Sequence, residues 1–269
     1  MAAAFPPTIW LIFAVAMLIS SVGFIKYIYF ISIGYGFSIA GMGMLLLAMF
    51  IPQLTPGTIA CCVLMVLYGI RLGGFLLFRE RKSATYNSTM KTEIKDGKTM
   101  GFIAKSFLWL TCAALYVLQV LPVFYRLNNG KDSDIFCWAG AVIMLFGICF
   151  ESASDWQKNK LKKKNPKRFC DTGLFRIVRC PNYLGEMIFW TGVIISGIGA
   201  INSAAQWGMA LLGYFGIIFV MFSGARRLEL RQNRNYGNDP EYQEYVKTVP
   251  ILLPGVPLYS VAKYKFLVA

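Results

Sequence analysis

Long apolar stretches alternate with short polar segments along the chain. An α-helix needs about 20 apolar residues to cross the hydrocarbon layer of a bilayer, which is roughly 30 Å thick. Little more than Lys26 separates the first two stretches, so we expect a tight hairpin there. The pattern predicts an all-α integral membrane protein that forms one polytopic domain over residues 1–269. Its seven expected spans are residues 8–25, 27–51, 57–78, 102–125, 135–154, 183–201 and 205–225.

Composition supports this interpretation. Hydrophobic residues make up 57% of the chain and charged residues 15%, whereas a soluble domain has about 45–50% apolar and about 25% charged residues. The excess of apolar residues excludes a disordered chain, a coiled coil and an ordinary cytosolic enzyme.

Positive charge predicts the orientation, because Lys and Arg are retained on the cytoplasmic side of a membrane. One side of the predicted bundle holds only Arg126 and Lys131, both in one loop. We therefore expect the N-terminus outside and the C-terminus in the cytosol, in the endoplasmic reticulum or a bacterial inner membrane. Almost all of the remaining Lys and Arg residues lie in four segments that follow alternate spans: Lys26, 79–101, 157–182 and 226–269.

The residue inventory also excludes several kinds of chemistry. Retention in the cytosol and attraction to anionic membrane lipids account for the net charge of +14, and the chain has no soluble module with a basic face for nucleic acid. It contains no His, which excludes His metal ligands and His-activated nucleophiles. None of the seven Cys residues forms a C-x-x-C motif, so we expect no metal.

Ionisable side chains inside spans are costly and are often functional. Arg71 lies three residues after Tyr68 in the third span. Glu151 and Asp155 are four residues apart at the end of the fifth span, on one helical face. Glu186 lies one turn into the sixth span.

The densest polar segment covers residues 170–190. Arg176 and Arg179 precede a helix that we expect to start near Asn182, a residue suited to the N-cap. Helix N-termini and arginines both attract anions. The sequence predicts a pocket for a phosphate-bearing ligand at the cytosolic mouth, but it has neither G-x-G-x-x-G nor a Walker motif. The second half of this pocket would come from the cluster after the last span: Arg226, Arg227, Glu229, Arg231 and Arg234.

The segment DTGLFRIVRCPNYLGE, from Asp171 to Glu186, resembles the signature of the steroid 5-alpha-reductase family. It is most similar to the form DTGLWRYSRHPNYFGE of that family's less characterised branch. The segment YGNDPEYQEY from Tyr236 is similar to the same branch, and so is Ser154-Asp155. The resemblance covers roughly residues 60–260, with a reductase-like C-terminal region at about 100–260. It implies a seven-span enzyme that holds NADPH in a bundle open to the cytosol.

The resemblance implies roles for individual residues. Tyr68, by its spacing from Arg71, matches the catalytic tyrosine. It would donate a hydrogen bond to the carbonyl oxygen of an α,β-unsaturated ketone while NADPH supplies hydride to the β-carbon. Glu186 is the second catalytic residue, and with Asn182 it would hold the nicotinamide end. The other implied cofactor contacts are Arg71, Asp155, Arg176, Arg179, Tyr183, Arg227, Glu229, Arg231 and Tyr236.

The chain also departs from the family pattern. The steroid enzymes carry a Gln-Glu pair in an earlier span and a His in the last segment, and both are missing here. Cys180 stands where the branch signature has His. The substrate, an apolar molecule that enters from the bilayer, therefore stays open between a steroid and another lipid-like enone.

Two other classes of protein stay open. A membrane methyltransferase of the isoprenylcysteine or phospholipid type, which uses S-adenosylmethionine, shares the R-x-P-x-Y step, but its Glu-Glu pair is reduced here to Glu229. A non-enzymatic seven-span receptor or transporter fits the number of spans. The concentration of polar groups at one mouth favours a cofactor pocket over a transport path.

Overall fold

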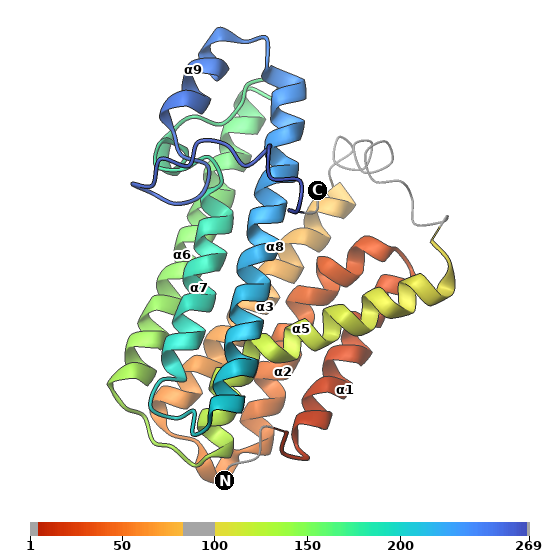
Figure 1. The fold of residues 1–269 in the computed structure, drawn as a ribbon, viewed down its shortest axis with the longest axis vertical. Coiled ribbons are helices and arrows are strands. Elements are labelled where there is room, and N and C mark those ends of the chain that lie inside the picture. Colours follow the sequence, from red (N-terminus) through yellow and green to blue (C-terminus); the bar gives the residue numbers. More distant parts are fainter. Residues whose placement is uncertain (1–4, 83–99, 268–269) are drawn as a thin grey trace. The chain divides into compact units, whose positions relative to one another are not determined.

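The computed structural model describes residues 5–82 and 100–267, and among these the regular elements are all helices, with no strand. Each predicted apolar stretch contains one α-helix. Most of the basic segment 79–101 lies outside the described residues. The α-helices are α1 (Ile9–Ser20), α2 (Ile33–Met49), α3 (Pro56–Lys82), α5 (Phe102–Asn128), α6 (Ile135–Lys164), α7 (Pro181–Ser196), α8 (Ala204–Tyr236) and α9 (Pro240–Thr248) (Figure 1).

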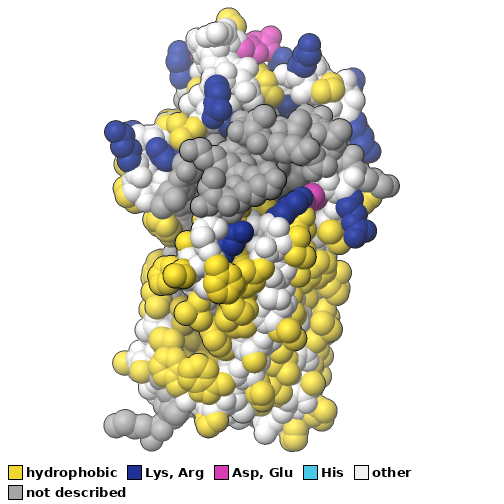
Figure 2. All heavy atoms as spheres, turned by 90° about the vertical axis from the view of Figure 1, so that its right-hand side faces the viewer, with side chains coloured by type: hydrophobic (Ala, Val, Ile, Leu, Met, Phe, Trp, Pro, Cys, Tyr) yellow, Lys and Arg dark blue, Asp and Glu magenta, His cyan; other side chains and the backbone are white. Residues whose placement is uncertain are grey.

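Four of these helices, α3, α5, α6 and α8, are long enough and apolar enough to cross a membrane. The apolar helices α1, α2 and α7 are shorter. Large apolar side chains on several helices face outward; Leu18 is 74% exposed and Ile103 is 84% exposed. Figure 2 shows a broad apolar area with few charged groups on one face. An exposed apolar surface of this kind needs lipid around it, so the chain is an all-α membrane protein.

Several predicted boundaries were wrong. The second helix begins at Ile33 rather than at residue 27, because short 3-10 turns at Ser21–Phe24 and Tyr27–Ile31 form the connection. The fifth and seventh predicted spans continue as helix to Lys164 and Tyr236. Their added turns are rich in Lys, Arg, Gln and Glu, which favour helix without apolar character.

The chain divides into two compact units, and each is described here by itself. The first contains residues 1–141 and 193–214, and the second contains residues 142–192 and 215–269. Helices α6, α7 and α8 each contribute residues to both units.

In the first unit, helices α2 and α3 come into backbone contact at glycines. A Cβ atom added to Gly36 would lie 2.6 Å from the backbone nitrogen of Gly73 and 3.0 Å from the carbonyl oxygen of Gly69. Gly69 and Gly73 are four residues apart, so they form one stripe of small residues along α3. Such a stripe lets helices in a membrane approach closely, and this crossing places the residues next to Gly36 and Gly69 against each other.

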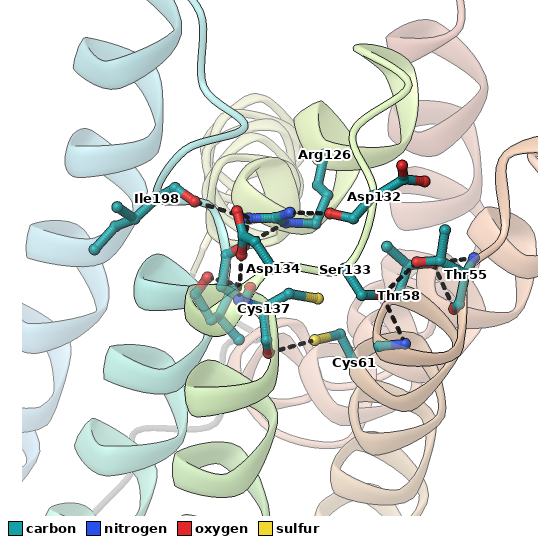
Figure 3. Close-up of polar contacts among 12 residues, drawn as sticks. Thr55, Thr58, Cys61, Arg126, Asp132, Ser133, Asp134, Cys137 and Ile198 are labelled. Carbon is teal, nitrogen blue, oxygen red and sulfur yellow. Dashed lines mark hydrogen bonds and ion pairs between the residues drawn. The ribbon is translucent and has the colours of Figure 1, made fainter.

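Arg126 was predicted to lie in a loop, and that was wrong: it belongs to the last turn of α5 and is 1% exposed. Its Nε donates to the carbonyl oxygen of Ser196 at 2.7 Å, and its Nη2 donates to that of Ile198 at 2.7 Å. Nη2 also lies 2.9 Å from both carboxylate oxygens of Asp134, and Nη1 bonds the carbonyl of Asp132 (Figure 3). The side chain therefore satisfies carbonyls at the C-terminal end of α7, which is why a charge is retained in the bundle.

In the second unit, the segment after α9 packs onto Cys180 and α8. Arg226 donates to the carbonyl oxygens of Ala262 and Leu267 at 3.1 and 3.0 Å and so holds this segment along α8. Burial raises the pKa of the Cys180 thiol to about 12, so the side chain is a neutral, small apolar group. Its cluster consists of Cys180, Ala225, Ile251, Leu252, Val261 and Leu267.

Candidate active site

Arg179 and Glu229 form a buried ion pair in the second unit. Arg179 lies in the segment before α7, and Glu229 lies on α8. The Nη2 of Arg179 is 2.9 Å from Oε1 of Glu229, and the two side chains are 1% and 3% exposed. Nη2 also donates to the carbonyl of Tyr259, while Oε2 of Glu229 accepts from the backbone N–H of Val261 at 2.9 Å. These extra hydrogen bonds offset the cost of burying both charges.

Two nitrogens of this guanidinium form no hydrogen bond of good geometry within residues 5–82 and 100–267. The Nε and Nη1 of Arg179 are buried without a hydrogen bond, and so are the hydroxyl oxygens of Ser154 on α6 and Ser223 on α8. Buried donors without partners are uncommon and costly. Guanidinium N–H groups donate strong, charge-assisted hydrogen bonds to phosphate oxygens. The chemistry of the Arg179 guanidinium is therefore suited to an anion such as a phosphate group.

The first two turns of α7 carry Asn182, Tyr183 and Glu186. The prediction that Asn182 caps this helix was wrong, because α7 starts at Pro181 and Asn182 lies inside its first turn. Proline suits the first helical position, where the missing N–H has no intrahelical partner. Glu186 is 5% exposed, so its carboxyl group is held away from water.

Glycines bring α7 against both neighbouring helices of this unit. A Cβ atom added to Gly185 would lie 2.7 Å from the backbone nitrogen of Glu151 on α6. One added to Gly224 on α8 would lie 3.2 Å from Cζ of Tyr183. The two close approaches fix the helices that carry Glu151, Asp155 and Glu186.

The remaining predicted contacts of this unit are spread over its surface. Tyr236 accepts a hydrogen bond from Nζ of Lys162 at 2.9 Å, and its ring lies 5.7 Å from that of Tyr242. Arg176 and Arg227 are exposed, and Asp155 and Arg231 are partly buried.

Tyr68 and Arg71 belong to the first unit. Tyr68 is 0% exposed, and its hydroxyl oxygen lies 3.0 Å from that of Tyr35 on α2. Arg71 lies one turn along α3, with its guanidinium carbon 5.7 Å from the ring centre of Phe75. Tyr35 was not among the predicted site residues. The available signal was the repeated Tyr-Gly pair, Tyr35-Gly36 and Tyr68-Gly69, which marks the crossing of the two helices.

Gln119 on α5 was also missed. Its side chain is 2% exposed, and neither its amide nitrogen nor its amide oxygen has a hydrogen-bond partner in the part of the chain that the structure describes. It lies three residues after Tyr116, on the same face of the helix. A donor and an acceptor left open in an apolar bundle are suited to a polar group on a ligand.

Comparison with known proteins identifies the family. The family described as "Protein of unknown function (DUF1295)" matches residues 12–249. Steroid 5-alpha-reductase DET2 from Arabidopsis thaliana is 29% identical over 103 residues, which are 36% of this chain and 36% of that protein. The chain thus matches about a third of the length of this relative, and no solved structure matches it. The predicted family is confirmed: the chain belongs to the DUF1295 family, which is steroid 5-alpha-reductase-like.

Proposed function

We propose that the chain is a membrane reductase that uses NADPH to reduce the C=C bond of an apolar α,β-unsaturated ketone. The observation that carries this proposal is the hydroxyl of Tyr68, which is fully buried among apolar helices and bonded to a second hydroxyl. A fixed donor in a dry site is what a developing enolate oxygen requires. The partial similarity to a plant steroid 5-alpha-reductase supports the same reaction class.

The proposed NADPH site has its charged part at Arg179. In this proposal Nε and Nη1 of Arg179, which form no hydrogen bond of good geometry with the described residues, donate to the phosphate groups, and Asn182 and Glu186 hold the nicotinamide end. When bound, NADPH supplies the hydride. The further contacts in this proposal are Arg71, Asp155, Arg176, Tyr183, Arg227, Glu229, Arg231 and Tyr236.

The protein's own part in the reaction is positioning and electrostatics. Tyr68 donates a hydrogen bond to the substrate carbonyl oxygen, where negative charge develops during reduction of the β-carbon. The proton that completes the reaction reaches the α-carbon from Tyr68 or from water. The substrate is a steroid or another lipid-like enone, and it enters from the bilayer.

The proposed topology has seven spans, with the N-terminus outside and the C-terminus in the cytosol. The first span combines α1 with its 3-10 extension to Phe24, which gives an apolar segment over Ile9–Phe24. In this topology the cofactor site opens to the cytosol. The proposed membrane is the endoplasmic reticulum or a bacterial inner membrane.

Cofactor binding to the detergent-purified protein tests the proposal. A ligand that binds only the folded state raises the temperature of unfolding. We expect NADPH to do so in the native protein and not in an Asn182→Ala, Glu186→Ala variant. Stabilisation by S-adenosylmethionine alone would contradict the proposed reductase and favour a methyltransferase. Stabilisation by neither ligand would favour a receptor or transporter.

A further inference from the structure

Two tyrosines from different helices meet by their hydroxyl groups in the first unit. The oxygens of Tyr35 on α2 and Tyr68 on α3 are 3.0 Å apart. Their ring centres are 6.3 Å apart at an interplanar angle of 75°. The side chains are 6% and 0% exposed, so this hydrogen bond forms away from bulk water.

The helix crossing fixes the meeting of these two hydroxyls. Each tyrosine directly precedes a glycine of the α2–α3 crossing, Gly36 or Gly69. There the backbones are so close that a Cβ atom on Gly36 would meet α3 backbone at 2.6 Å. Two backbones in such close contact hold the neighbouring side chains in a narrow range of positions.

The ring of a third tyrosine packs against that of Tyr35. The ring of Tyr116 on α5 lies 5.0 Å from that of Tyr35, at 38°. Its hydroxyl donates to the carbonyl oxygen of Phe30, in the turn before α2. Tyr116 is thereby held at its polar end and packs its ring near that of Tyr35, whose hydroxyl lies beside that of Tyr68.

The number of hydrogen bonds that a tyrosine hydroxyl can donate and accept suggests different roles for Tyr35 and Tyr68. A tyrosine hydroxyl donates one hydrogen bond and accepts others at its oxygen. If Tyr68 donates to a substrate carbonyl, its oxygen can accept the proton of Tyr35. As charge develops on the substrate oxygen, the Tyr68 O–H bond is polarised, and a donor to its oxygen becomes more favourable.

We propose that Tyr35 is the positioning residue for Tyr68: its hydroxyl donates to the Tyr68 oxygen and directs the Tyr68 proton toward the substrate carbonyl. This inference rests on the proposed enone reduction. Tyr35 acts through Tyr68 and does not itself touch the substrate.

Tyr35→Phe and Tyr116→Phe form a matched pair of variants. Each removes one buried hydroxyl from the same cluster, but only Tyr35→Phe removes the hydroxyl that lies 3.0 Å from that of Tyr68. With a steroid enone and NADPH, we expect Tyr35→Phe to lower kcat about tenfold or more, as the loss of one hydrogen bond in the transition state does. KM should stay within about twofold of the native value. Tyr116→Phe should change kcat much less.

Double variants separate positioning from general damage. In a Tyr68→Phe background, Tyr35→Phe should cause no further loss, because the group that it directs is already gone. Tyr116→Phe should have the same small effect in both backgrounds. An equal loss from Tyr35→Phe with and without the Tyr68 hydroxyl would overturn the proposal.

An infrared measurement tests the hydrogen bond without turnover. The C–O stretching band of Tyr68 is obtained as the difference between native protein and Tyr68→Phe. We expect it to shift in Tyr35→Phe and not in Tyr116→Phe, and an unshifted band contradicts the proposal whatever the reaction. If the native protein reduces no enone, the proposed function fails and the catalytic part of this inference fails with it. Reduction with independent effects of Tyr35 and Tyr68 overturns the inference alone.

Discussion

The side chain of Arg179 has a structural role and a proposed role in binding the cofactor. Its Nη2 bonds Glu229 and the carbonyl of Tyr259, whereas Nε and Nη1 form no hydrogen bond of good geometry with the described residues. The Glu229→Gln variant leaves a buried guanidinium without its counter-charge, so the free energy of unfolding should fall by about 3–5 kcal/mol. Denaturation in detergent measures this.

A double variant serves as the control for this prediction. The Arg179→Met, Glu229→Met variant removes both charges together, and we expect it to recover most of the lost stability. It should still lose the stabilisation by NADPH. Retention of that stabilisation in the double variant would show that Arg179 holds no part of the cofactor.

Asp134 gives the stability a dependence on pH. Burial alone would raise the pKa of this carboxyl, but hydrogen bonds from the backbone N–H of Cys137 and from Arg126 outweigh burial and lower it. A lowered pKa in the folded state stabilises the protein above the unfolded pKa, and this stabilisation disappears as pH falls through the folded pKa. Below about pH 4, the unfolding temperature of native protein should approach that of Asp134→Asn. A difference between them that does not change with pH would contradict this.

At the scale of elements, the α2–α3 crossing depends on Gly36. Gly36→Ala places a methyl group against α3 backbone, so we expect the free energy of unfolding to fall by about 1–3 kcal/mol. The rate of enone reduction should fall too, because Tyr35 and Tyr68 separate. Gly74 on α3 has no atom within 4 Å of an added Cβ, so Gly74→Ala is the matched control and should be neutral or stabilising by up to about 1 kcal/mol. Equal changes in the free energy of unfolding for Gly36→Ala and Gly74→Ala would contradict a close α2–α3 contact at Gly36.

The existence of the helices could be predicted from hydropathy, but their ends could not. The apolar pattern of α6 stops near residue 154, whereas the helix continues to Lys164. Hydropathy reports where a helix meets lipid, and a polar helix leaves no such signal. The start of α2 was misplaced for the opposite reason, because the apolar residues of Tyr27–Ile31 form a 3-10 turn.

The site residues show the same limit more clearly. Motif and charge singled out Tyr68, Arg179 and Glu229 one by one. Nothing local in the sequence states that Arg179 pairs with Glu229, or that Tyr68 has Tyr35 as its partner. Those pairings depend on long-range packing, and neither Tyr35 nor Gln119 carries a charge that would mark it in an apolar segment.

At the scale of the whole molecule, the topology is testable by labelling single cysteines. Lys131 and Lys167 are both exposed, and the proposed seven-span arrangement puts them on opposite sides of the membrane. In sealed vesicles that present the non-cytosolic face of the membrane outward, with Cys149 replaced by Ser, a membrane-impermeant maleimide should label Lys131→Cys from outside. It should label Lys167→Cys only after permeabilisation. Labelling of both positions from one side would contradict seven spans.

The central claim is that this membrane protein reduces an enone with the Tyr68 hydroxyl as hydrogen-bond donor. The most direct measurement follows the consumption of NADPH by purified native protein and by Tyr68→Phe, with a steroid enone and a second, non-steroid lipid enone as alternative substrates. We predict turnover by the native protein and a kcat lower by about 10²–10³ in Tyr68→Phe, with the stabilisation by NADPH unchanged. Equal rates in the two proteins, or no turnover in a native protein that NADPH stabilises, would contradict the claim.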